Sequence, residues 1–140
     1  MPLKRKIVVV EDDQPILDMM DILLRRIGYE PVLVPDVQDA LLRVKNDPPA
    51  LILLDVVMEA ENAGLQLVRY IRRNLGNSLV RIILRTGQPG QAPEYEVLTE
   101  YNINDYREKT ELTAPKLYTT LITALRSYRD LMIIDTSRKG

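Results

Sequence analysis

The fold of this chain is decided by Ala50-Leu51-Ile52-Leu53-Leu54-Asp55, an unbroken apolar run that ends on a carboxylate. A run without polar alternation is typical of a strand that is buried on both faces, as the central strands of parallel sheets are. The run is too short to cross a bilayer. We therefore expect a central strand whose end places Asp55 at the carboxyl edge of a sheet.

Strand-like and helix-like segments alternate along the rest of the chain, as they do in parallel α/β proteins. The other expected strands are Ile7–Val10, Val32–Val34, Val80–Leu84 and Ile103–Tyr106. Five helices are expected. The first is Gln14–Ile27, the second carries Ala40, Leu41 and Val44, and the third is Gly64–Leu75. The fourth is short and begins near Pro93, and the fifth is a long final helix that Thr113 caps. Right-handed crossovers fold this pattern into a doubly wound sheet of five parallel strands.

Local signals predict where the first two helices begin and end. Asp13 precedes a first turn that contains Pro15, which predicts an N-cap, and Asp36 is predicted to cap the second helix. Gly28 is expected to cap the end of the first helix, and the Asp47-Pro48-Pro49 turn is expected to stop the second.

The composition limits the functions that this chain can have. Its 140 residues fit one domain, and a hydrophobic fraction of 46% suffices for a core. Nineteen basic and twenty acidic residues nearly balance, so the overall charge gives no reason to expect binding to nucleic acid or a membrane. Because cysteine and histidine are both absent, disulfides, thiolate chemistry and imidazole catalysis are excluded. No apolar run matches a membrane span or a signal peptide, and we expect a cytoplasmic protein.

Polar side chains follow four of the expected strands, at the sheet edge where doubly wound proteins bind ligands. They are Glu11, Asp12 and Asp13 after the first strand, Asp55 after the third, Thr86 after the fourth and Lys109 after the fifth. Crowded carboxylates repel one another unless a cation intervenes, and ligation by oxygen alone indicates Mg²⁺. Asp55 can then act as a nucleophile toward phosphorus, while Lys109 and Thr86 donate to the transferred group.

Four segments of the chain resemble the receiver domains of bacterial two-component systems. The segments are Ile7-Val8-Val9-Val10-Glu11-Asp12-Asp13, Leu53-Leu54-Asp55-Val56-Val57-Met58, Thr86-Gly87 and Asp105-Tyr106-Arg107-Glu108-Lys109, within a similarity that runs from about Lys6 to Arg129. The resemblance implies a flavodoxin-like sheet with strand order 2-1-3-4-5 and an extended C-terminal helix. It also implies that Asp55 is the phosphoacceptor and that Glu11, Asp12, Asp55 and the backbone carbonyl of Val57 hold Mg²⁺.

The same resemblance assigns roles at the ends of the last two strands. Lys109 and Thr86 would contact the phosphoryl group, and Thr86 with Tyr106 matches the family's switch pair, in which an aromatic side chain follows the hydroxyl inward. The phosphoryl donor would be a sensor histidine kinase or a phosphotransfer protein, since this chain has no histidine. The implied function is a signalling switch rather than an enzyme, with at most slow hydrolysis of its own aspartyl phosphate.

Three positions depart from the family pattern. Glu59 stands where the family usually has proline, and the stretch Glu59–Gly64 is one residue longer than usual. Thr110 stands where the family has a cis proline, and because a cis bond before another residue costs about 3 kcal/mol, a trans bond is expected. Gly87–Pro93 replaces a loop and a regular fourth helix on the usual output face, which predicts a changed partner or dimer mode.

The output of this switch is indicated by resemblance. Leu84–Glu94, Asn104–Tyr106 and Lys109–Thr113 are similar to receivers that precede an HD-GYP domain, which hydrolyses cyclic di-GMP. We expect a receiver domain over residues 1–130 and, over 131–140, the start of a linker helix toward an output domain that this chain lacks. The final helix carries an apolar stripe formed by Leu117, Leu121, Leu125, Tyr128 and Met132. We expect the first half of this stripe to pack on the sheet. The second half predicts a homodimer through a short coiled coil.

Two other classes of protein fit parts of the sequence. A pseudo-receiver would keep the fold and act through protein contacts without phosphorylation, as the changes at Glu59 and Thr110 would allow. An unrelated ligand-binding domain of the same topology would need a phosphate loop rich in glycine or serine after the first strand. Glu11-Asp12-Asp13 stands at that place and argues against an anionic cofactor.

Overall fold

The computed structural model describes residues 6–55, 63–86, 103, 105–108 and 114–139, and for 63, 86, 105–108, 114 and 137–139 it describes the backbone only. A parallel sheet forms the centre of the molecule, with strand order β2-β1-β3-β4-β5. This is the order that the resemblance to receiver domains implies. The strands are β1 (Lys6–Val10), β2 (Glu30–Val34), β3 (Leu51–Asp55), β4 (Arg81–Thr86) and β5 (Asp105–Glu108).

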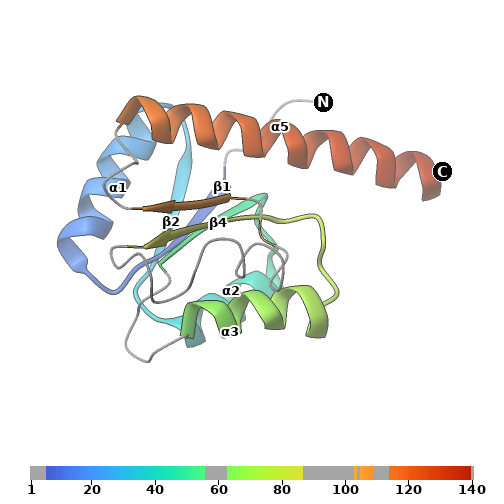
Figure 1. Ribbon diagram of the computed structural model, residues 1–140, viewed down its shortest axis with the longest axis horizontal. Coiled ribbons are helices and arrows are strands. Elements are labelled where there is room, and N and C mark those ends of the chain that lie inside the picture. The colour runs from blue at the N-terminus through green and yellow to red at the C-terminus, as the bar shows by residue number, and fades with distance from the viewer. Residues whose placement is uncertain (1–5, 56–62, 87–102, 104, 109–113, 140) are drawn as a thin grey trace.

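Helices cover both faces of the sheet. Figure 1 shows α1 (Gln14–Arg26) and α5 (Ala114–Lys139) on one side and α2 (Val37–Asn46) and α3 (Ala63–Arg69) on the other. Every residue of β3 is buried, as an unbroken apolar strand at the centre of the sheet requires. Its side chains alternate between two cores: Ile52 and Leu54 pack on the α2 and α3 side, and Leu51 and Leu53 on the α1 and α5 side.

The predicted N-caps are confirmed. The Asp13 carboxylate accepts a hydrogen bond from the backbone N–H of Ile16 at 3.4 Å and so caps α1, which also has a proline in its first turn. The carboxylate of Asp36 accepts from the N–H of Asp39 at 2.8 Å and caps α2. Asp13 is therefore engaged at the start of α1, directly after the two acidic residues of the predicted site.

Gly28 ends α1 as predicted, in a left-handed conformation with φ of 92°. Its N–H donates to the carbonyl of Arg25 at 3.1 Å, and the N–H of Tyr29 donates to the carbonyl of Leu24 at 2.9 Å. This pair of bonds is the Schellman pattern, and Leu24 and Tyr29 both pack in the core beneath it. The turn sends the chain directly into β2.

Two elements differ from the prediction. The helix expected as one unit over Gly64–Leu75 is α3 followed by a π-helical segment, η1 (Tyr70–Asn74). The Arg72 guanidinium donates to the carbonyls of Asn77 at 3.0 Å and Val80 at 2.8 Å, which ties this wider turn to the start of β4. The last strand is β5, over 105–108 rather than Ile103–Tyr106, while Ile103 is buried in the core just before it.

The stripe of α5 packs on the sheet in its first half as predicted, since Leu117, Leu121 and Leu125 are buried. The helix then continues past the sheet without interruption (Figure 1), and it carries Ile133 and Ile134 with about half of each side chain exposed. The boundary predicted after residue 130 thus falls within a continuous helix and stays a prediction. Among the described residues, none of the helices has both the length and the apolar character that a membrane span needs.

Candidate functional site

Three carboxylates meet at the carboxyl edge of the sheet. Glu11 and Asp12 directly follow β1, and Asp55 is the last residue of β3, the neighbouring strand. The N–H of Glu11 donates to the carbonyl of Val34 at 3.1 Å, so the main-chain pairing with the β2 side continues one residue past β1. One carboxylate oxygen from each of the three residues lies within 4.8 Å of the other two.

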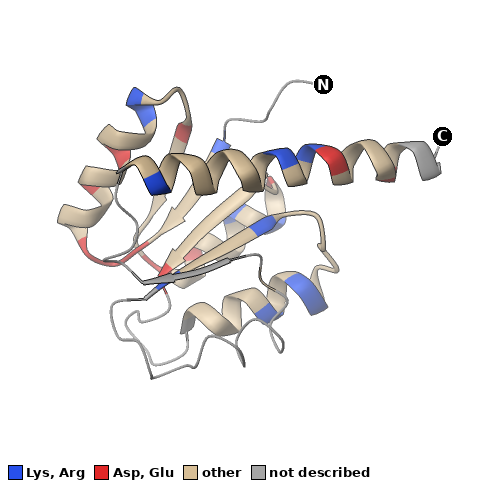
Figure 2. Ribbon diagram, turned by 45° about the horizontal axis from the view of Figure 1, so that its top comes forward, with Lys and Arg blue, Asp and Glu red and all other residues tan. Residues whose placement is uncertain are grey.

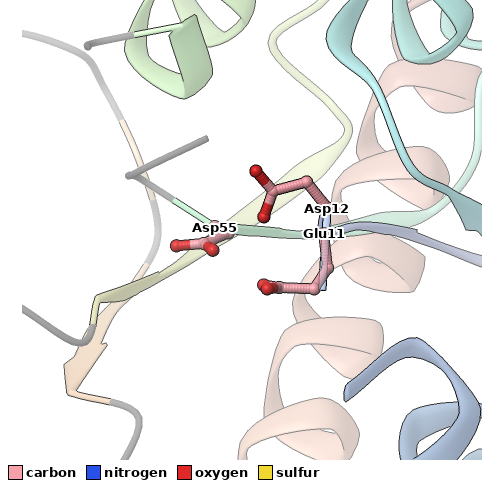
Figure 3. Close-up of side chains that lie close together, drawn as sticks. All are labelled: Glu11, Asp12 and Asp55. Carbon is pink, nitrogen blue, oxygen red and sulfur yellow. The ribbon is translucent and has the colours of Figure 1, made fainter. Parts of the chain in front are cut away.

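The cluster has a buried floor and an exposed rim. Glu11 and Asp55 are 1% and 3% exposed, whereas Asp12 is exposed. In Figure 3 the three side chains extend into one shared space, with Asp12 and Glu11 approaching Asp55 from the end of β1. The turn that joins β1 to α1 is correspondingly acidic in Figure 2. A cation could therefore enter from the Asp12 side and meet two ligands that the protein already holds in place.

Strand alternation explains why Glu11 and Asp55 lie side by side. In the paired register, Val9 lies opposite Leu53, and both side chains pack on the α1 and α5 side of the sheet. Side chains two residues further along a strand return to the same face. Glu11 and Asp55 therefore occupy the next level of that face, above the apolar core, where the sheet ends.

A residue that the sequence analysis did not assign, Arg85, completes this level on the other side of Asp55. It pairs in register with Asp55 across β3 and β4 and is 5% exposed. Burial lowers the pKa of its guanidinium, and the nearby carboxylates of Glu11 and Asp55 act in the opposite direction. The signal in the sequence was its spacing: Arg85 comes two residues after the core residue Ile83 on a buried strand.

The donor set fits a hard divalent cation. Three carboxylates with a partly open side match the oxygen ligands of Mg²⁺, which usually keeps several waters and takes few protein ligands. The imidazole and thiolate ligands that softer metals favour are absent from the sequence, which has neither histidine nor cysteine. Of the predicted metal ligands, the structure thus brings Glu11, Asp12 and Asp55 together.

The other predicted site residues are described in part or not at all. Lys109 and Val57 lie outside the described residues, as do Glu59, Thr110 and the Gly87–Pro93 stretch. Thr86 is the last residue of β4, and its backbone pairs in register with that of Glu108 on β5. Lys109 directly follows Glu108 in the chain. The backbone of Tyr106 pairs with Leu84 on the same two strands. Their predicted roles stay predictions.

The fold and this site define an α/β protein with an acidic cluster at the carboxyl edge of a doubly wound sheet. Residues 7–122 match the model of the response regulator receiver domain. The chain therefore belongs to the response regulator receiver family, as the resemblance of its four segments predicted. This membership overturns the alternative of an unrelated ligand-binding domain, and it implies a role in two-component signalling.

Curated relatives are similar in sequence to parts of this chain. It is 62% identical over 91 residues to the 3'3'-cGAMP-specific phosphodiesterase 2 of Vibrio cholerae, a match that covers 65% of this chain and 17% of the relative. It is 29% identical over 105 residues to the phosphate regulon transcriptional regulatory protein PhoB of Escherichia coli, covering 75% of this chain and 45% of that protein. The chain thus corresponds to less than half the length of either relative.

Solved structures share the fold at low sequence identity. A CheY-like receiver domain protein from Methanospirillum hungatei superposes with a TM-score of 0.80 at 21% identity, over 92% of this chain and 98% of that one. The receiver domain of a LuxO-type repressor from Vibrio parahaemolyticus gives a TM-score of 0.81 at 19% identity, over 94% and 98%. At these identities the likeness establishes the fold and says nothing further about the site.

Proposed function

We propose that this receiver is a phosphorylation-dependent switch in which Asp55 accepts a phosphoryl group. The observation that carries the proposal is the cluster of Glu11, Asp12 and Asp55 within 4.8 Å at the sheet edge of a receiver-family chain. The phosphoryl donor would be a sensor histidine kinase or a phosphotransfer protein, because the chain has no histidine of its own.

In the proposed step, a carboxylate oxygen of Asp55 attacks the phosphorus of a phosphohistidine. A P–O bond forms and the P–N bond breaks, so that the donor imidazole leaves with the electron pair and takes up a proton. Glu11 and Asp12 would hold Mg²⁺, which when bound neutralises charge between the carboxylates and the incoming phosphoryl group. Burial of Asp55 limits the access of water and so favours transfer over hydrolysis.

Resemblance to the family assigns the remaining roles, and the strand register supports them. Thr86 lies one residue beyond the Asp55–Arg85 pair on β4, and Lys109 follows Glu108, the register partner of Thr86. We propose that Lys109 and Thr86 donate to the phosphoryl oxygens, that the Val57 carbonyl is a further metal ligand, and that Thr86 with Tyr106 forms the switch. Thr86→Ala should then uncouple phosphorylation from any change in association.

Intact-mass analysis after incubation with acetyl phosphate tests the proposal. With Mg²⁺ we expect one phosphoryl adduct, which EDTA abolishes and which is absent from Asp55→Asn. Asp36→Asn is the matched control: it makes the same substitution at an N-cap outside the cluster and should keep the adduct. An adduct that persists in Asp55→Asn would refute the assignment. No adduct with acetyl phosphate or with a phosphorylated kinase would instead favour the pseudo-receiver.

We further propose that the receiver belongs to a longer protein in which it controls a cyclic-dinucleotide phosphodiesterase. One support is the 62% identity over 91 residues to the 3'3'-cGAMP-specific phosphodiesterase 2. The other is the resemblance of this chain to receivers that precede HD-GYP domains. The open reading frame that follows Gly140 should encode such a domain. In that full-length protein, hydrolysis of 3'3'-cGAMP and of cyclic di-GMP should differ between the phosphorylated form and Asp55→Asn.

A homodimer through the end of α5 is part of the same proposal. The helix continues beyond the part that packs on the sheet and leaves Ile133 45% and Ile134 50% exposed. Two such ends could bury their apolar side chains against each other. Sedimentation of a double variant, Ile133→Gln with Ile134→Gln, should show weaker self-association than the wild type, and equal association would count against the dimer.

A further inference from the structure

Arg85 is a buried cation beside the acidic site that the proposed chemistry does not use. It lies on β4 directly across from Asp55, on the strand face that Ile83 and Leu53 occupy in the core below. Only 5% of the residue is exposed, so water contributes little to the solvation of its charge. A buried guanidinium is costly unless anions or hydrogen-bond acceptors surround it.

Comparison with Arg81 shows what is particular to Arg85. Arg81 is also buried, on the same face at the other end of β4, but its guanidinium donates to the carbonyls of Leu79 at 2.9 Å and Ser78 at 2.5 Å. Its role is to fix the turn before the strand. The Nε of Arg85, by contrast, donates to no group in the part of the chain that the structure describes.

Among the described side chains, the charges that act on Arg85 are those of the site. Glu11 and Asp55 are the carboxylates whose charge acts on the Arg85 guanidinium, and both are buried on its own face of the sheet. Without a metal, Glu11, Asp12 and Asp55 place three negative charges within 4.8 Å, and one fixed positive charge beside them reduces their mutual repulsion. A divalent cation that enters the same space is repelled by that positive charge.

We propose that Arg85 is a positioning residue of the acidic site, an internal counter-cation that balances Glu11 and Asp55 in the metal-free protein and thereby weakens Mg²⁺ binding. The proposal rests on the proposed function in one respect, that the three carboxylates bind Mg²⁺. It shifts the occupancy of the site to higher Mg²⁺ concentrations than the carboxylates by themselves would require.

Calorimetric titration of the whole chain with MgCl₂ tests the proposal. Removing the charge in Arg85→Met or in Arg85→Gln should tighten Mg²⁺ binding about tenfold, which equals about 1.4 kcal/mol. Arg85→Lys keeps the charge and should bind within about threefold of the wild type. Arg25→Gln is the matched control, because it removes one positive charge from an exposed ion pair with Asp21 on α1 and should leave the affinity unchanged.

A second readout separates electrostatics from a structural role. In EDTA, Arg85→Met should unfold at a lower temperature than the wild type, and saturating Mg²⁺ should raise its midpoint by more than it raises that of the wild type. A merely structural arginine would lower the midpoint equally with and without Mg²⁺. If Arg85→Met does not fold, Arg85→Gln and Arg85→Lys still give the comparison of affinities.

The outcomes distinguish this inference from the proposed function. Equal or weaker Mg²⁺ binding by the charge-removing variants would overturn the role of Arg85, while a phosphoryl adduct on wild-type Asp55 would leave the proposed function intact. A wild-type chain that binds no Mg²⁺ would overturn both. Tighter binding in Arg85→Met and Arg85→Gln, with wild-type affinity in Arg85→Lys, is the result that the proposal requires.

Discussion

Replacing Asp12 by asparagine should stabilise the metal-free protein. The Asp12 carboxylate lies within 4.8 Å of those of Glu11 and Asp55. Coulomb's law gives about 0.9 kcal/mol of repulsion for each pair at that distance in the dielectric of water, and more where protein replaces water. Because Asp12 is exposed, the lower value applies, and removing two such pairs should raise the free energy of unfolding by about 1–2 kcal/mol at low ionic strength.

Urea unfolding followed by far-ultraviolet circular dichroism measures this gain. In EDTA at neutral pH, the midpoint of Asp12→Asn should lie about 1 M above that of the wild type, given the slope that is usual for a domain of this size. Added salt should reduce the difference, because it screens the repulsion. Mg²⁺ should narrow or reverse it, because the cation stabilises the wild-type cluster more than the variant.

Asp13→Asn provides the control for this experiment. It removes one negative charge from the next residue, outside the cluster, and asparagine caps a helix about as well as aspartate does. Its unfolding free energy should stay within about 0.5 kcal/mol of the wild type. If Asp12→Asn is no more stable than the wild type in EDTA, or if Asp13→Asn gains as much, the reasoning from mutual repulsion is wrong.

Two further predictions concern the scaffold that holds the site. Leu53→Ala, in the core directly below Asp55, should lower the free energy of unfolding in urea by about 2–5 kcal/mol. The same change at Leu42, which is 59% exposed on α2, should alter it by no more than about 0.5 kcal/mol. Equal losses at the two positions would contradict the assigned burial. Gly28→Ala should lower the free energy of unfolding by about 1 kcal/mol because the φ of Gly28 is +92°. No atom lies within 4 Å of an added methyl group, so no steric clash is expected. A much larger loss would show that more than backbone conformation is involved.

Much of the fold follows from local signals in the sequence. The unbroken apolar run of β3 identifies the central strand, and the side-chain chemistry of Asp13, Asp36 and Gly28 marks helix ends within a few residues of where it acts. The doubly wound sheet follows from the alternation of strands and helices together with the handedness of crossovers, whereas its strand order was implied by the resemblance to receiver domains. The same alternation places Glu11, Asp12 and Asp55 at one edge, so the cluster could be predicted before its geometry was known.

Long-range packing decided what these signals could not. The segment η1 departs from a regular helix where Arg72 reaches carbonyls at Asn77 and Val80, and no local periodicity records that contact. The last strand begins two residues later than the apolar pattern indicates, after Ile103, which is buried in the core before the pairing with β4 begins.

Some features of the acidic site were likewise determined by the sequence and others by the tertiary structure. Its ligand types and their place at the strand ends were determined by the sequence, because the three carboxylates stand at the ends of two apolar strands, β1 and β3. The depth of Glu11 and Asp55, the exposure of Asp12 and the position of Arg85 beside Asp55 were decided by the tertiary structure. The physical reason is that charge acts through space: Arg85 is 30 residues from Asp55 along the chain, and the register of β3 with β4 makes them neighbours.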